Sequence, residues 1–384
     1  MFNKETQERC LAYPVRVLEI IPIPGPPDEN GKPTVAKDRD GNPYIKVEYA
    51  KVLGWWCVVK AGEFKVGDWA IYFEIDSQTP EKPEYEFLRP RKFRIKTQKL
   101  CGVLSQGLCL PPKDVLPSDF DFSSLSEDLD LTAALGVVKY EPGEGPLKNE
   151  KILPGFAKGR FPSFIKKTDQ ERIQNLTFVV ENIPFDYEVT EKLDGSSISI
   201  YNRNVPNVKE DGSIELTPEF GVCSRNLELK LDTAGNCSLE NNVGDYVSAV
   251  LRLKLDEKIK QVCCDLKRNL AFQFEFVGPG VQKNKYQMKE HDLRCFDIWD
   301  IDQHCYLRPT ERREICSRYD ISHVPVINSK LDLRLSVEKM LDMAVGKTVF
   351  GNNPNQQREG LVFKHNTENF SFKAISNVFL LEGK

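Results

Sequence analysis

The sequence lacks the cysteine and histidine patterns of metal-binding and secreted domains. Its eleven cysteines include no Cys-x-x-Cys pair, and only four histidines accompany them. Such a chain has neither a structural zinc motif nor a disulfide framework. We therefore expect reduced, mostly buried thiols and an intracellular protein, located in the cytoplasm or the nucleus.

The sequence also lacks long apolar runs and a strong charge of one sign. No run approaches the length of a membrane span, and residues 1–5 contain no apolar signal region, so we expect no membrane association. The 53 basic and 57 acidic residues leave a net charge of −4. The chain as a whole does not attract polyanions, and a nucleic-acid site must therefore be a local basic patch.

Hydrophobic residues make up 40% of the 384 residues, which is enough apolar material for two or three domains. Residues 1–115 predict a small β-barrel, because β-branched and aromatic runs alternate there with turns; the runs are residues 15–21, 44–49, 56–59 and 69–75. About five short strands favour a barrel of the OB type. The basic, aromatic segment 89–99 suits a phosphate-binding strand on this barrel, and an ordinary solvated strand explains it equally well.

Two further regions follow the predicted barrel. Residues 116–160 are acidic and then rich in proline and glycine, which predicts a linker with one short helix. Residues 161–384 mix strand and helix patterns, which predicts an α+β domain.

Capping and proline patterns predict several helices in this second domain. We expect helices to start at Thr168, Pro309 and Ser336, and a pair of helices separated near Asp256 within residues 241–269. The polar blocks that carry chemistry lie on or beside the strand-like runs between these helices.

The strongest of these blocks is Glu-Lys-Leu-Asp-Gly-Ser-Ser at residues 191–197. It predicts a nucleophilic lysine, Lys192, held at a tight turn for which Gly195 provides backbone freedom. An exposed lysine has a pKa of about 10.4 and is almost wholly protonated, so it does not attack. Desolvation or a nearby cation favours the neutral amine and makes Lys192 a nucleophile.

Three carboxylates on separate strand-like segments predict a cation next to this lysine. Asp194 is part of the same block, Glu275 interrupts an apolar run, and Glu359 directly precedes a glycine and another apolar run. Taken singly, each would be an ordinary surface charge. An unpaired carboxylate at Glu275 would be costly to bury, whereas together the three suit a hydrated Mg²⁺ ion.

Cationic and aromatic residues complete the candidate site. Arg225 suits bidentate binding of phosphate, and Lys373 offers a point charge. The alternative for Lys373 is a surface lysine whose apolar stem packs on the strand while its ammonium group reaches solvent. Phe296 could stack on a nucleotide base, and ordinary core packing is the alternative.

The order of these blocks resembles the motifs of the covalent nucleotidyltransferase superfamily, which includes ATP-dependent RNA and DNA ligases and mRNA capping enzymes. The matching blocks, motifs I, Ia, III, IIIa, IV and V in turn, are residues 192–195, 224–226, 274–278, 296–298, 359–364 and 372–374. With residues 102–108 and 167–175, they are most similar to RNA ligase family 5, the Deinococcus and Naegleria type. The resemblance covers nearly the whole chain. It implies an OB-like barrel followed by an ATP-grasp-like transferase domain with antiparallel sheets and flanking helices.

The resemblance implies an ATP-dependent RNA ligase that works in three steps. Lys192 attacks the α-phosphate of ATP to form a lysyl-AMP, the AMP passes to an RNA 5′-phosphate, and an RNA 3′-OH displaces it. The expected substrate is RNA with 3′-OH and 5′-phosphate ends in a nicked duplex. The expected metal is Mg²⁺ or Mn²⁺, and the expected state is a monomer.

The resemblance also assigns roles to residues. The metal is held by Asp194, Glu275 and Glu359, and ATP or AMP is contacted by Glu191, Lys192, Phe296, Val362 and Lys373. Substrate phosphates are met by Arg172, Arg225, Asn226, Lys364 and Lys373. The chain departs from the wider superfamily at Ser371, where motif V usually has a second lysine.

Two alternatives remain. A DNA ligase or capping enzyme would share the lysine pocket but usually carries an OB domain after motif V, and only eleven residues follow Lys373. A non-catalytic nucleic-acid-binding protein with a degenerate transferase domain is the second. The retained lysines and carboxylates argue against it, because degeneration would first remove the nucleophile or the metal ligands.

Overall fold

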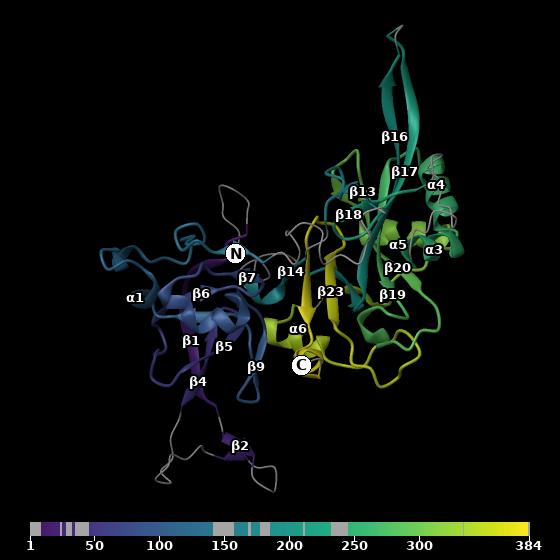
Figure 1. Cartoon of the computed structure of the whole chain (residues 1–384). Helices are drawn as coiled ribbons and strands as arrows, with labels where there is room; N and C mark the ends of the chain where they lie inside the picture. Colours follow the sequence, from purple (N-terminus) through teal and green to yellow (C-terminus); the bar gives the residue numbers. More distant parts are fainter. Residues whose placement is uncertain are drawn as a thin grey trace. The chain divides into compact units, whose positions relative to one another are not determined.

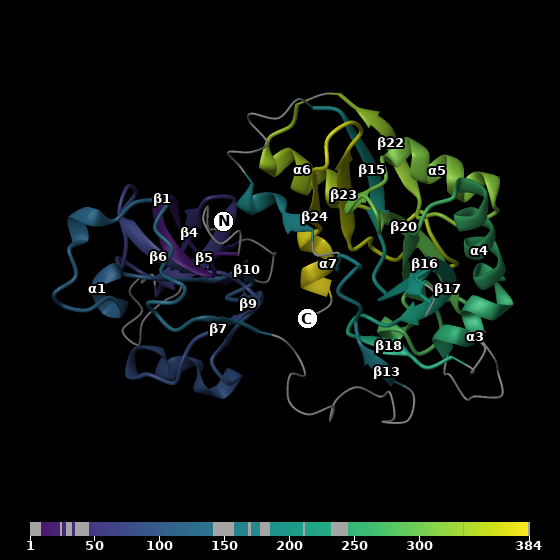
Figure 2. The same cartoon turned by 90° about the horizontal axis from the view of Figure 1, so that it is seen from above.

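The computed structural model describes residues 9–23, 25–27, 33–34, 46–140, 157–167, 170–176, 185–209, 212–231, 245–332 and 334–382 (Figures 1 and 2). The chain divides into two compact units. The first comprises residues 1–146, 173–182 and 381–384, and the second comprises residues 147–172 and 183–380. Among the described residues, no helix combines the length and the apolarity that a membrane span requires.

The first unit is a β-barrel of short antiparallel strands. Its main sheet has the order β11-β6-β1-β4-β5, with β1 Ala12–Pro22, β4 Val47–Val52, β5 Trp55–Lys60, β6 Trp69–Phe73 and β11 Leu108–Leu110. Smaller sheets comprise β7 Ser77–Gln78, β8 Arg94–Ile95 and β12 Val138–Lys139, then β9 Gln98–Leu100 with β10 Val103–Ser105, and β2 Gly25–Pro27 with β3 Pro33–Thr34. The strands predicted within residues 1–115 therefore form, and Trp55, Tyr13 and Tyr72 are fully buried in the barrel core.

Residues 116–140, expected in a linker, pack on this barrel instead. Leu131 and Leu135 are buried with Phe73, and the Leu131 amide donates to the Ala12 carbonyl at 2.9 Å. The helix α1 (Pro112–Val115) ends just before this region, and within 116–140 the structure has a 3₁₀ turn at Phe122–Ser124 in place of the expected helix. Although residues 116–140 are acidic overall, they include enough leucine and valine to extend the core of the barrel.

The basic segment 89–99 is not one strand. A 3₁₀ helix, Pro83–Arg91, precedes two short strands, β8 and β9. The Arg89 guanidinium is bound by Glu86 and Glu81, and Arg94 pairs with Asp76 at 2.9 Å. Local carboxylates therefore neutralise part of the positive charge that the sequence suggested for phosphate binding.

The second unit contains two antiparallel-rich sheets (Figure 2). The seven-stranded sheet has the order β13-β18-β17-β16-β19-β20-β21, with β13 Ala157–Arg160, β16 Ser196–Val208, β17 Ile214–Cys223, β18 Leu227–Leu229, β19 Leu270–Val277, β20 Asp292–Asp300 and β21 Cys305–Tyr306. The five-stranded sheet has the order β14-β24-β23-β15-β22, with β14 Glu171–Arg172, β15 Tyr187–Lys192, β22 Val326–Leu331, β23 Gly360–His365 and β24 Ser371–Ile375.

Helices cover the seven-stranded sheet. The apolar sides of α3 (Asp245–Arg252), α4 (Leu255–Leu266) and α5 (Pro309–Arg318) pack on Phe272 and Phe274 of β19 in the largest core. Two further helices are α6 (Val337–Ala344) and α7 (Asn377–Glu382). This α+β arrangement of sheets and flanking helices is the predicted fold class, and the long β16–β17 hairpin stands out in Figure 1.

Most predicted helix starts are confirmed. Pro309 opens α5, and Ser336 caps α6 by accepting from the Lys339 amide at 3.3 Å. The predicted pair within residues 241–269 is α3 and α4, which separate two residues earlier than expected, at Lys254. The helix expected from Thr168 is wrong for the described part, because Glu171 and Arg172 pair with β24 as a strand. Thr168 itself lies outside the described residues.

Candidate functional site

Ladder register brings several predicted site residues to one face of the five-stranded sheet. Lys373 of β24 lies opposite Arg172 of β14 and opposite Val362 of β23. Val362 in turn lies opposite Thr190, two residues before Lys192 in β15. Because side chains alternate between faces along a strand, Arg172, Lys373, Val362 and Lys192 share a face.

The turn after Lys192 is where the chain leaves the five-stranded sheet for the seven-stranded one. β15 ends at Lys192 and β16 begins at Ser196. A Cβ atom on Gly195 would lie 2.3 Å from the Phe276 carbonyl oxygen. Gly195 is therefore needed for close approach to β19 rather than for the backbone freedom expected from the sequence, since its φ is not left-handed.

Carboxylates surround the Lys192 ammonium. Its Nζ lies 2.7 Å from Glu359 Oε2, across the pair of strands β15 and β23. Burial alone would lower the pKa of Lys192, but the negative charges of Glu359, Glu275 and Asp194 outweigh it and raise that pKa above its ordinary value. In the protein by itself, these carboxylates therefore favour the ammonium form of Lys192.

Glu275 is a partly buried residue of β19. Burial raises its pKa to about 7, with Lys192 opposing the rise and Glu359 adding to it. One Glu275 oxygen accepts from the Gly195 amide at 2.8 Å. The carboxylate on β19 is thereby attached to the turn that follows the nucleophile.

Asp194 has two partners that sequence reasoning missed. Lys285 Nζ lies 2.5 Å from Asp194 Oδ2, and the Asp194 amide donates to the Tyr286 hydroxyl at 2.7 Å. Tyr286 is buried in a small core with Leu193 and Phe350. Neither Lys285 nor Tyr286 belongs to a motif, and no local pattern in the sequence distinguishes these two residues from other loop residues.

The three acids fit a hydrated cation better than a directly chelated one. Within the described ranges, no three His, Cys, Asp or Glu side chains are arranged to ligate an ion by themselves. Asp194, Glu275 and Glu359 nevertheless all act on the Lys192 charge. Mg²⁺ keeps several of its waters, so carboxylates that hold it through water need no direct cluster.

Phe296 lies at a β-bulge in β20. Across the ladder with β19, Gln273 pairs with Asp297 while Phe274 pairs with Cys295, which leaves Phe296 as the extra residue. Bulges change the direction of a side chain and often lie beside active sites. The Phe296 ring is partly buried and packs on the core that includes Leu193, just after Lys192.

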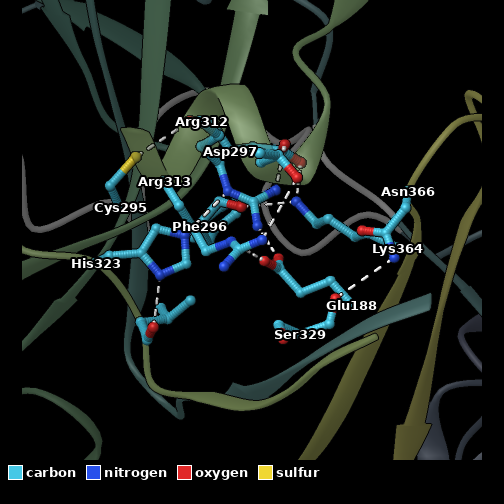
Figure 3. Close-up of polar contacts among 12 residues, drawn as sticks. Glu188, Cys295, Phe296, Asp297, Arg312, Arg313, His323, Ser329, Lys364 and Asn366 are labelled. Atoms are coloured by element: carbon cyan, nitrogen blue, oxygen red, sulfur yellow. Dashed lines mark hydrogen bonds and ion pairs between the residues drawn. The ribbon is translucent and has the colours of Figure 1, made fainter. Parts of the chain in front are cut away.

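Lys364 is buried at the other end of β23 from Glu359. Its ammonium binds Asp297 at 2.5 Å and the Phe296 carbonyl at 2.6 Å (Figure 3). Burial lowers its pKa to about 8 against the attraction of Asp297. The contact of Lys364 with substrate phosphate stays a prediction, and in this structure the side chain ties strands together.

The remaining predicted site residues are Glu191, Arg225 and Asn226. Glu191 is 1% exposed, and its carboxylate accepts from the Thr348 hydroxyl and from the Val349 amide, the latter at 2.9 Å. It lies on the opposite face of β15 from Lys192. Arg225 and Asn226 are exposed in the turn between β17 and β18, where the Asn226 side chain accepts from Lys167 at 3.3 Å. Contacts of these three with ATP or RNA also stay predictions.

Comparisons with known proteins agree with this geometry. The RNA ligase family model matches residues 185–375, and a model of an OB-fold domain matches residues 42–112. No curated protein sequence matches. Three similar solved structures are of Naegleria gruberi RNA ligase at 36% identity: an alanine variant with ATP and Mn (98% and 99% of the two chains, TM-score 0.73), the enzyme with PPi (97% and 98%, TM-score 0.72) and another alanine variant with AMP and Mn (98% and 99%, TM-score 0.72). This likeness over almost the whole of both chains shows that the protein belongs to the family of ATP-dependent RNA ligases.

Proposed function

We propose that this RNA ligase seals nicks, joining an RNA 3′-OH to an adjacent 5′-phosphate in a duplex, and that Lys192 is the residue that becomes adenylylated. The observation that carries the proposal is the partly buried contact of Lys192 with Glu359, with Asp194 and Glu275 acting on the same charge. The Naegleria structures with ATP, AMP, PPi and Mn support ATP as co-substrate and a divalent metal.

In the first step, Lys192 Nζ forms a bond to the α-phosphorus of ATP while the bond from that phosphorus to the bridging oxygen breaks. Pyrophosphate leaves, and the lysine nitrogen gives up its proton. Lys373 and Arg172, neighbours across β14 and β24, supply positive charge on the face that Lys192 shares. Ser371 stands where motif V usually has a second lysine. Because Arg172 lies next to Lys373, it is our candidate to provide the missing positive charge.

Asp194, Glu275 and Glu359 would hold a hydrated Mg²⁺ or Mn²⁺ ion. A bound cation supplies positive charge that favours the neutral amine and stabilises the transferring phosphate. Without it, the same three carboxylates keep Lys192 protonated. The residues thus couple occupation of the metal site to release of the nucleophile.

The first unit would grip the RNA duplex, with residues 1–115 as the OB-like barrel and residues 161–384 as the adenylyltransferase domain. The OB-fold match to residues 42–112 supports the first assignment, and the RNA ligase match to residues 185–375 supports the second. We also infer a monomer, and we infer that it is located in the cytoplasm or nucleus. The ten free cysteines among the described residues support the second of these inferences.

Incubation with α-labelled ATP and Mn²⁺, followed by denaturing gel electrophoresis, tests the proposal. The wild-type protein should become labelled, and unlabelled nicked duplex with a 3′-OH ribonucleotide should then remove the label as sealed product forms. A protein that binds RNA but never becomes labelled would instead support the degenerate, non-catalytic alternative.

A further inference from the structure

The bulge that presents Phe296 needs support from outside its own ladder. A bulged residue leaves the strand pairing locally disrupted, and its backbone groups need other partners. The Phe296 carbonyl receives the Lys364 ammonium of β23 at 2.6 Å, as Figure 3 shows. On the other side of β20, the Cys295 amide donates to the Ser322 carbonyl at 2.8 Å.

A buried arginine completes this support. Arg312 of α5 is 0% exposed, and its guanidinium contacts Glu188 of β15 and lies 3.7 Å from Asp297 of β20. Its Nε donates to His323 Nε2 at 3.0 Å. Burial and the Arg312 charge lower the pKa of His323 to about 3, so this imidazole is neutral and can accept. Arg312 thus joins β15, β20 and the segment after α5.

The cluster of Glu188, Asp297, Arg312 and Lys364 connects three strands that carry the candidate site. Glu188 lies four residues before Lys192 on β15, Asp297 directly follows Phe296, and Lys364 shares β23 with Val362. All four residues are at most 6% exposed. Buried ion pairs are costly to desolvate and often add little net stability, and in some proteins their use is to specify one conformation.

We infer that Arg312 is a positioning residue, which acts with Glu188, Asp297 and Lys364 to hold the β20 bulge so that the Phe296 ring meets the base of the nucleotide. The inference rests on the proposed function, since it requires Phe296 to stack on that base. Arg312 touches neither substrate nor metal in this role. Its effect on the reaction passes through the position of Phe296.

The same helix and strand carry a matched control. Arg268 pairs with Asp300 at the far end of β20 and with Glu311, the neighbour of Arg312 on α5, both at 2.6 Å. This second ion-pair cluster links the same two elements without contacting the bulge. Loss of either cluster should lower stability, but only loss of the first should displace Phe296.

The test is the dependence of autoadenylation on ATP concentration in single and double variants. Arg312→Lys keeps the charge and loses the planar fork, and it should raise the KM for ATP by about tenfold with a maximal rate within about twofold of wild type. Stacking on the base is made equally in the ground state and the transition state, so its loss changes KM. Phe296→Ala should show the same pattern.

Coupling between the two positions separates positioning from general stability. Arg312→Lys combined with Phe296→Ala should have a KM close to that of Phe296→Ala alone, because both remove the same contact. Arg268→Met should leave KM unchanged, both alone and in the Phe296→Ala background. Thermal unfolding of every variant records the loss of stability separately.

Glu188→Gln answers the same question without changing Arg312, and it decides the outcome if Arg312→Lys does not fold. An unchanged KM in these variants, or an effect that multiplies fully with that of Phe296→Ala, would overturn the inference. A wild-type protein that ATP never labels would instead overturn the proposed function, so the two failures are distinguishable.

Discussion

At the scale of single residues, the surroundings of Lys192 oppose its proposed role as a nucleophile, because neighbouring carboxylates favour its charged form. Glu359, Glu275 and Asp194 raise its pKa, although burial lowers it. A nucleophile held as an ammonium ion does not react with water-borne electrophiles. In the proposed mechanism, a cation held by the same acids would favour the neutral amine.

Replacing Lys192 removes the group that we propose forms the covalent intermediate. Lys192→Ala should abolish labelling by α-labelled ATP. The variant should still seal a nick whose 5′ end is supplied already adenylylated, because that step needs no lysyl-AMP. Label on the Lys192→Ala protein would refute the assignment of the nucleophile.

Gly195 tests how tightly the turn after Lys192 must fit. An added Cβ would meet the Phe276 carbonyl oxygen at 2.3 Å, so Gly195→Ala must shift the turn away from β19. A misplacement of this size should slow autoadenylation by about 10²-fold. Gly159→Ala is the control, since an added Cβ there has nothing within 4 Å. Equal rates for the two variants would contradict this account.

Lys364 gives a pH dependence whose sign follows from its lowered pKa. Its pKa is about 8 in the folded protein against an ordinary 10.5, with Asp297, Arg312 and Glu188 facing it. Between these values the unfolded chain binds more protons, so the free energy of unfolding should rise with pH. Relative to Lys364→Met, the wild type should gain at most about 1.4 kcal/mol per pH unit from pH 8 to 10. Denaturant unfolding measures this difference, and a pH-independent difference would contradict it.

At the scale of elements, the segment after β14 stabilises the first unit. The 3₁₀ turn Ile173–Asn175 belongs to that unit, and the Gly54 amide donates to the Gln174 carbonyl at 3.2 Å. The Asn175 side chain accepts from the Trp55 indole and donates to Glu74 at 3.1 Å. A short piece of chain between two stretches of the second unit thus forms hydrogen bonds to Gly54, Trp55 and Glu74 of the barrel.

Asn175→Ala should therefore destabilise the first unit. Both Trp55 and Glu74 are buried, and each would lose a hydrogen-bond partner, which costs about 1–3 kcal/mol. Asn207→Ala is the control, because its bond to Thr217 is exposed. Thermal unfolding should show a lower midpoint for Asn175→Ala and little change for Asn207→Ala. Similar midpoints for both variants would show that this turn contributes nothing.

At the scale of the whole molecule, proposed nick sealing is best tested by comparing nicks whose 3′-OH strand ends in RNA or in DNA. We expect sealing to slow greatly when deoxyribonucleotides replace the 3′-OH ribonucleotide terminus. The 2′-hydroxyl is the group by which a protein distinguishes RNA from DNA at such a site. Single-turnover sealing of matched nicks measures this, and equal rates on all-DNA and RNA-terminated nicks would contradict it.

The sequence by itself indicated the fold class and the family, and it predicted which residues form the site. Short, ordered blocks around Lys192, Glu275 and Glu359 were visible because motifs record residue types at fixed local spacing. The barrel strands were visible as apolar runs between turns. The extent of the first unit was not, because the apolar residues within 116–140 are spread through acidic sequence and the turn at 173–175 joins the barrel from a distance.

Only the tertiary structure decided which residues meet. Lys285 and Tyr286 reach Asp194, and Arg312 reaches Glu188 across 124 positions of sequence. No pattern in a single sequence encodes such pairs, because strand register and helix packing bring them together. The same packing showed that Gly195 is required for its small size, and it placed Phe296 at a bulge whose carbonyl accepts from the buried Lys364 ammonium.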